Sequence, residues 1–188
     1  MPQVKAWQQG YLDGLCGIYA ILNATRCLYP TKATEEVLTR MWHDVITEFG
    51  DRMAHILLKG TTRDQVSALI RSAGAFTRRE GIGEIHSYQP YRNRKVASLD
   101  LYWQDMATWL SPKRRVAIIG LGKPWEHWTV ITSVSAGAVN FQDSYGIRVF
   151  PRSRFVPGKP KGTEIALDYH QTFLIDRDPI PRRRVTQV

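Results

Sequence analysis

The spacing of hydrophobic residues changes character along the chain. Up to about residue 112, apolar side chains recur every three or four positions, which is typical of helices that bury one face. From about residue 113, apolar residues form short continuous or alternating runs between glycine and polar residues, which is typical of strands. A helical half followed by an antiparallel sheet is an α+β arrangement. We expect the two halves to meet along a cleft.

Four helices are predicted in the first half. Thr34 and Thr62 are suited to cap helix starts, because a threonine hydroxyl can accept a hydrogen bond from the first turn. Gly74 is predicted to stop the third helix, and Pro112 to end the fourth. The segment 76–98 is rich in Gly, Arg and Tyr and is predicted to be irregular. The predicted helices span about 15–28, 34–49, 62–74 and 99–110.

The second half is predicted to form an antiparallel sheet. Hairpin turns are expected near Gly137 and at Tyr145-Gly146. We therefore predict a single domain over 1–178, followed by a basic, Pro- and Arg-rich tail over 179–188. Its helical half would cover about 1–112 and its sheet half about 113–178. The predicted strands are 115–122, 127–134, 138–144, 146–150 and 171–176.

The chain carries a formal net charge of +9, and its 43% hydrophobic content argues against disorder. The positive charge favours an acidic partner, but it is scattered over several short clusters instead of one basic helix. A merely solvated basic surface is the simpler interpretation. The stretch 88–103 mixes basic and aromatic residues and is the best candidate for binding nucleic acid or an acidic protein. Nucleic acid is not the partner we expect.

The two cysteines indicate a reducing compartment. Cys16 and Cys27 are eleven residues apart, which in a helix is about 16 Å. A disulfide needs Cα atoms about 4.4–6.8 Å apart, so both are predicted to be free thiols. The chain shows no apolar signal segment at its start and no apolar run of about 18 residues. We predict a cytoplasmic protein, or an effector delivered without a classical signal peptide, with no membrane partner.

Cys16 is the strongest candidate for chemistry. It lies between Gly14 and Gly17 at the predicted start of a helix. The positive end of the helix dipole stabilises a thiolate there, which is how reactive cysteines are commonly made. The glycines allow close backbone approach and are expected to leave the sulfur accessible. Cys27, inside the same helix, is expected to pack without a chemical role.

A thiolate nucleophile usually works with an imidazole, and that imidazole with an acceptor that orients it. His127 opens a predicted strand directly after a loop, where a side chain can point into a cleft. Asp143 follows on the next predicted strand, so antiparallel pairing could bring the two side by side. Alternatively, His127 is a sheet-edge histidine and Asp143 an ordinary turn residue.

The ordered set QQGYLDGLCG, HWTVI and FQDSYG, spread over about 8–150, resembles the papain-like cysteine peptidases, including the bacteriocin-leader peptidases. The resemblance implies a helical half, with the nucleophile at a helix start, packed on a C-terminal antiparallel sheet. It implies a thiol hydrolase that cleaves a peptide or isopeptide amide through a thioester acyl-enzyme. Cys16 would be the nucleophile, His127 the general base and acid, and Asp143 the residue that orients the imidazole.

The same resemblance implies an oxyanion hole made of the Cys16 backbone N–H and an upstream side-chain donor. Gln9 is seven residues before the cysteine and Gln8 eight, whereas the gap that is familiar in the family is about one residue shorter. One extra residue in the loop 10–15 could absorb the difference, so Gln9 is the first choice and Gln8 an alternative. The Asp-Gly-Leu-Cys piece is similar to the ovarian-tumour-type deubiquitinases, which makes Asp13 a second alternative. An amide NH₂ can donate and an ionised carboxylate cannot, which favours Gln9.

The substrate is expected to be a protein or peptide, acidic or ubiquitin-like. Trp125 and Trp128 flank the candidate base and are candidates for binding it, although both could simply pack in the interior. Neither a metal-ligand spacing nor a phosphate-binding glycine loop is present in the sequence, so no metal or cofactor is expected. The same residues could instead perform acyl transfer or glutamine deamidation, and a basic binding module without catalysis is the alternative from another class.

Overall fold

The structure is a computed structural model that describes residues 6–9 and 14–180. It is an α+β protein in which the helices lie mainly in the N-terminal part and the sheet mainly in the C-terminal part. The helices are α1 (Cys16–Leu28), α2 (Glu35–Phe49), α3 (Met53–Lys59), α4 (Arg63–Arg79) and α5 (Leu99–Leu110), with 3-10 turns at Gly50–Arg52 and Arg152–Arg154. The strands are β1 (His86–Tyr88), β2 (Arg115–Leu121), β3 (His127–Val134), β4 (Ala138–Gln142), β5 (Val149–Pro151), β6 (Phe155–Val156) and β7 (Ile165–Asp176).

One sheet organises the molecule. Its strands are ordered β1-β7-β2-β3-β4-β5, and each of these neighbours pairs antiparallel, while β6 pairs parallel with β7. The central strand β2 is buried on both faces, which explains why its sequence is a continuous apolar run instead of an alternating one.

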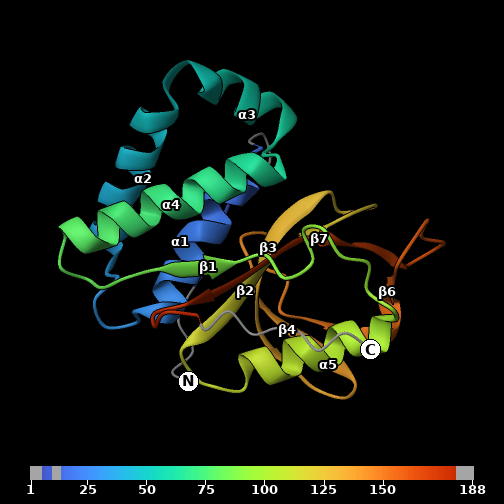
Figure 1. The fold of residues 1–188 in the computed structure, drawn as a ribbon. Helices are drawn as coiled ribbons and strands as arrows, with labels where there is room; N and C mark the ends of the chain where they lie inside the picture. The colour runs from blue at the N-terminus through green and yellow to red at the C-terminus, as the bar shows by residue number, and fades with distance from the viewer. Residues whose placement is uncertain (1–5, 10–13, 181–188) are drawn as a thin grey trace.

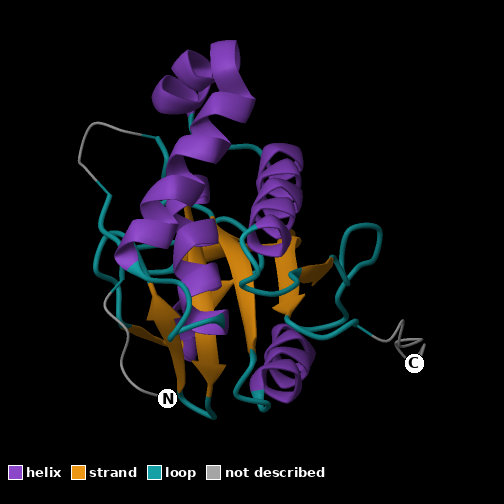
Figure 2. Cartoon of the chain, turned by 90° about the vertical axis from the view of Figure 1, so that its left-hand side faces the viewer, coloured by secondary structure: helices purple, strands orange, loops and turns teal. Residues whose placement is uncertain are grey.

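Successive residues of the central strands face opposite sides of the sheet. Val116 and Ile118 of β2 contact one hydrophobic cluster, whereas Ala117 and Ile119 contact another. The first cluster is covered by α1, α2 and α4, and the second by α5, which lies on the other side of the strands in Figure 1. Figure 2 shows the same arrangement from the side. Residues 181–188 of the predicted tail lie outside the described residues.

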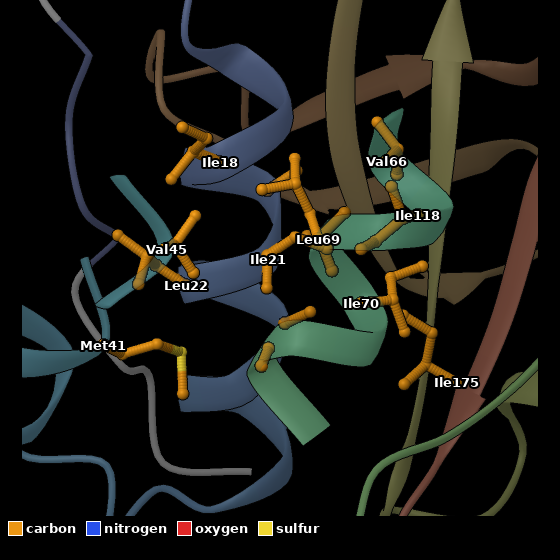
Figure 3. Packing of buried hydrophobic residues seen from close by; sticks show 14 of the residues in the cluster. Ile18, Ile21, Leu22, Met41, Val45, Val66, Leu69, Ile70, Ile118 and Ile175 are labelled. Carbon is orange, nitrogen blue, oxygen red and sulfur yellow. The ribbon is translucent and has the colours of Figure 1, made fainter. Parts of the chain in front are cut away.

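Helix α1 lies at the centre of the first cluster. Figure 3 shows its Ile18, Ile21 and Leu22 among apolar side chains of α2 and α4 and of the sheet. Most residues of α1 are buried, as expected for a helix covered on several sides. Its amino-terminal end is therefore held firmly relative to β3, against which it also packs.

The predicted helix starts are confirmed. Thr34 caps α2 by accepting a hydrogen bond from Val37, and Thr62 forms a capping box with Gln65 at the start of α4. The predicted stop at Gly74 is wrong, because α4 continues to Arg79. Gly74 is instead a buried position in α4, close to Ile85.

The sequence prediction missed α3, β1 and β6, which are all short. It also placed the fourth strand too early, since β5 begins at Val149, and it recognised only the second half of β7. The first half of β7 contains alternating polar residues, which conceal it among the loop residues of this region. That the chain is a single domain over 1–178 stays a prediction.

Candidate active site

Cys16 is the first residue of α1, as predicted. The hydrogen bonds within the helix begin with the N–H groups of Ile18 and Tyr19, which both donate to the Leu15 carbonyl. The N–H groups of Cys16 and Gly17 therefore have no acceptor inside the helix. The N-cap residue, Leu15, offers no side-chain acceptor either. The cysteine thus lies at a helix start whose backbone donors point away from the helix.

The glycines around Cys16 serve close packing. A Cβ at Gly14 would lie 2.6 Å from the Ile56 carbonyl oxygen, and one at Gly17 would collide with the Thr61 side chain. The Gly14 N–H also donates to the Leu57 carbonyl at 2.9 Å. The end of α3 and the residues after it therefore pack directly against the start of α1. Contrary to expectation, the cysteine is only 6% exposed, so the glycines do not leave it open.

His127 and Asp143 come together through the pairing of β3 with β4. Val130 pairs with Gln142, so continuing this register by one residue places Asp143 opposite Thr129, two residues from His127 on the same face. His127 Nε2 and Asp143 Oδ2 are 2.7 Å apart, and both side chains are buried. The structure thus brings together the two residues that the sequence could only place on adjacent strands.

Backbone donors hold the Asp143 carboxylate. Its other oxygen, Oδ1, accepts from the N–H groups of Tyr145 at 2.7 Å and Ile147 at 3.2 Å. Burial acts to raise the pKa of Asp143, but its hydrogen bonds with His127 and Ile147, the charge of His127 and the nearby Thr129 side chain outweigh it and lower the pKa. The carboxylate is therefore a fixed anion beside the imidazole.

His127 is surrounded by groups that stabilise its protonated form. Burial acts to lower the pKa of His127, but hydrogen bonds and charge interactions with Asp143 and Cys16 outweigh it and raise the pKa to about 9. Because Nε2 is used by Asp143, Nδ1 is the nitrogen left for the Cys16 thiol. Cys16, His127 and Asp143 therefore form one chain of interactions.

Tyr145 covers the imidazole and was missed in the sequence. Its ring stacks on His127 with centroids 4.5 Å apart and planes inclined by 14°. Tyr145 is 44% exposed while His127 is 2% exposed, so the tyrosine separates the imidazole from solvent. Tyr145 lies in the turn directly after β4, two residues beyond Asp143, and this closeness to Asp143 in the sequence is the signal that could have found it.

The oxyanion-hole candidates differ in their contacts. The Gln9 backbone N–H donates to the Ser144 carbonyl at 3.0 Å, and the Gln9 Oε1 accepts from the Ser144 hydroxyl at 3.3 Å. The Gln8 amide NH₂ instead faces the backbone carbonyls of Asp143 at 3.4 Å and Ala6 at 3.5 Å. The segment with both glutamines is thus joined to the Asp143 loop. Asp13 lies outside the described residues.

Of the two candidate tryptophans, Trp128 is packed in the interior and Trp125 is partly buried. Trp128 belongs to the first cluster, is 5% exposed, and donates its indole N–H to the Thr61 carbonyl at 2.8 Å. Trp125 is partly buried in the second cluster against Phe150. These contacts hold the loops around His127 in position and leave Trp128 little surface with which to bind a substrate.

A separate cavity of about 330 Å³ lies between α5 and the opposite end of β2. Arg115, at the start of β2, lines it, whereas His127 is opposite Leu121 at the end of that strand. Six residues of strand separate these positions by about 20 Å. Among the described residues that line this cavity there is neither a cysteine nor a histidine, so thiol chemistry points to the Cys16 site.

Within 6–9 and 14–180, no group of three or more His, Cys, Asp or Glu side chains is arranged to hold a metal ion. No helix over the same ranges is long and apolar enough to cross a membrane. Comparison with protein-family models and with curated proteins finds no match to this chain.

Proposed function

We propose that the protein is a thiol hydrolase with a papain-like arrangement, which cleaves a peptide or isopeptide amide. The observation that supports this most is that the buried His127 imidazole is held by the Asp143 carboxylate through Nε2 and also interacts with the Cys16 thiol. A nucleophile, a base and a group that orients the base are the three parts that acyl transfer requires.

In the proposed reaction, the imidazolium form of His127 stabilises the Cys16 thiolate. The sulfur attacks the scissile carbonyl carbon, and the C–S bond forms as the carbonyl electron pair moves onto oxygen. When this tetrahedral intermediate collapses, the C–N bond breaks and His127 donates its proton to the leaving amine. Water then attacks the thioester, with His127 accepting its proton, and the acid product and free thiol are released.

The developing oxyanion would be bound at the start of α1. The Cys16 N–H has no acceptor inside the helix, and a side-chain amide from Gln9 would supply a further donor. In this proposal Gln9 is the side-chain donor and Gln8 the alternative. Asp143 fixes the His127 imidazole, and Tyr145 keeps water away from the hydrogen bond between that imidazole and the carboxylate.

The alternative of a basic binding module receives less support. Its best segment, 88–103, contributes Tyr91, Tyr102 and Trp103 to the interior, where they are 7%, 0% and 1% exposed. Bases of a nucleic acid cannot stack on buried rings. Acyl transfer and glutamine deamidation would use the same three residues. In acyl transfer a group other than water attacks the thioester, and in deamidation the amide attacked by the thiolate is a glutamine side chain.

The two cysteines provide an internal control for the test. We expect iodoacetamide at pH 7 to label Cys16 much faster than Cys27, because burial raises the pKa of Cys27 to about 12, although Arg26 opposes the shift. Peptide mapping by mass spectrometry would give both rates in one sample. Cys16→Ala should abolish hydrolysis of a casein-derived peptide mixture, and Cys27→Ala should retain it. Equal labelling, or full activity of Cys16→Ala, would contradict the proposal.

A further inference from the structure

Helix α3 exposes apolar side chains beside the start of α1. Its sequence contains three consecutive apolar residues, Ile56, Leu57 and Leu58. Successive residues of a helix are about 100° apart around its axis, so three in a row cannot all face the interior when the helix packs on one side only. Ile56 is fully buried, whereas Leu57 is 40% and Leu58 81% exposed. The exposure of the two leucines therefore follows from the helical conformation of this segment.

The exposed leucines are held close to the nucleophile. The Gly14 N–H donates to the Leu57 carbonyl at 2.9 Å, and the Cα atoms of two residues joined in this way lie within about 7 Å of each other. Cys16 is two residues after Gly14, which adds at most about 7 Å. The Leu57 Cα is therefore within about 14 Å of the Cys16 Cα. An extended peptide covers this distance with about four residues.

Large exposed apolar side chains are concentrated around the candidate active site. Over the part of the chain that the structure describes, they are Leu57, Leu58, Leu101, Tyr145 and Val149. Leu57 and Leu58 adjoin the start of α1, and Tyr145 stacks on His127. Cys16 and His127 are themselves almost completely buried, so their exposed neighbours provide the surface that a substrate would contact. Much of that surface is apolar.

We infer that Leu57 and Leu58 bind the substrate and select a peptide with a large apolar side chain within about four residues of the scissile bond. The inference rests on the proposed function of Cys16 and names the class of peptide that the site accepts. Burial of apolar surface between the leucines and such a side chain favours it over a polar one. The contacts of α3 with Gly14 hold the backbone of the leucines in place before the substrate binds, so little ordering is needed on binding.

Cleavage of a peptide mixture measures this preference whichever side of the scissile bond the leucines contact. Peptides in a mixture compete for the enzyme, so their relative rates of cleavage give ratios of kcat/KM. In a tryptic digest of casein, wild type should cleave bonds near a Leu, Ile, Val, Met or Phe about tenfold faster than bonds without one, as mass spectrometry of the products would show. Leu58→Gln should lose most of this preference. Its Cys16 should still react with iodoacetamide, which has no such side chain, at a rate within about twofold of wild type.

Two further variants serve as controls. Leu58→Met keeps a large apolar side chain and should retain the preference. Leu101→Gln makes the same kind of change at a leucine that is 48% exposed on α5, on the other side of the sheet from α1 (Figure 1). It should cleave the mixture as wild type does.

The inference is overturned if Leu58→Gln retains the preference, if Leu101→Gln loses it equally, or if wild type shows none. It is also overturned if Leu58 contacts a second copy of the chain instead of the substrate. Size-exclusion chromatography would then show a dimer for wild type and a monomer for Leu58→Gln, with the preference unchanged. Wild-type cleavage no faster than that of Cys16→Ala would instead contradict the proposed function.

Discussion

Cys16 and Cys27 lie at opposite ends of α1, so one helix presents the same side chain in two environments. Cys16 is at the amino-terminal end, where backbone N–H groups have no acceptor inside the helix and His127 contacts the thiol. Cys27 is at the other end, where burial raises the pKa of its thiol to about 12 and Arg26 only partly opposes this. The two positions are about 16 Å apart along the helix.

Burial alone does not distinguish the two thiols. Cys16 is 6% exposed, and Cys27 is partly buried against the same cluster. What separates them is the presence of donors and of an imidazole beside the sulfur at one end only. The imidazole is in turn held by Asp143. Substitutions in this chain of contacts should make Cys16 behave increasingly like Cys27.

Removing the imidazole should have the largest effect. His127→Ala should lower hydrolysis by about 10²–10⁴-fold, because neither thiolate formation nor protonation of the leaving amine is assisted. It should also slow alkylation of Cys16 by iodoacetamide toward the rate of Cys27, which mass spectrometry of the two tryptic peptides would measure.

His43→Ala is the control for this experiment, since His43 is exposed on α2. It should leave both the hydrolysis rate and the ratio of the two labelling rates unchanged. A Cys16 that is still alkylated rapidly in His127→Ala would mean that the helix start alone activates the thiol.

The oxyanion donor should have the next largest effect. Gln9→Ala should reduce kcat by about 10²–10³-fold if its amide supplies one donor. Alkylation of Cys16 should hardly change, because the donor acts on the substrate oxygen and not on the sulfur. Gln8→Ala is the matched control and should cost much less. If Gln8→Ala lowers kcat more than Gln9→Ala does, Gln8 and not Gln9 is the oxyanion donor.

How far the sequence could predict the site depends on the range of each interaction. Cys16 was found because helix periodicity and glycines are local signals. His127 and Asp143 were found because each adjoins a strand, but their hydrogen bond depends on the β3–β4 register. The contact of Thr61 with Gly17 could not be predicted, since it requires the turn after α3 to pack against α1. That packing involves residues more than forty positions apart in sequence.

In the fold, too, features set by local sequence signals were predicted, and features set by long-range contacts were missed. Capped helices such as α2 and α4 carry their start signals within four residues, and both were predicted correctly. Gly74 misled the prediction because a glycine inside a helix can serve close packing, here near Ile85, as readily as it can end the helix. The short strand β1 exists because β7 offers an edge to pair with, which no local pattern of three residues can reveal.

The smallest of the predicted effects concerns pH. The pKa of His127 is raised to about 9, so its imidazolium is present below that pH and is lost above it. Activity that needs this proton should therefore fall as the pH rises through about 9. The stability contributed by the protonated imidazole should follow the same sign: it is fully present below the unfolded pKa of about 6.5 and is lost as the pH rises through about 9.

Asp143→Asn should move this alkaline limit downward without abolishing activity. A hydrogen bond to a charged group contributes about 1.5–3 kcal/mol, and one pKa unit corresponds to about 1.4 kcal/mol, so a shift of about one to two pH units is expected. The pH profile of kcat/KM for wild type and the variant would measure it, with Asp105→Asn on α5 as the control. An unchanged alkaline limit in Asp143→Asn would show that the contact with Cys16, and not the carboxylate, keeps the imidazole protonated. The difference between the two ends of α1 would then arise from the thiol and imidazole alone.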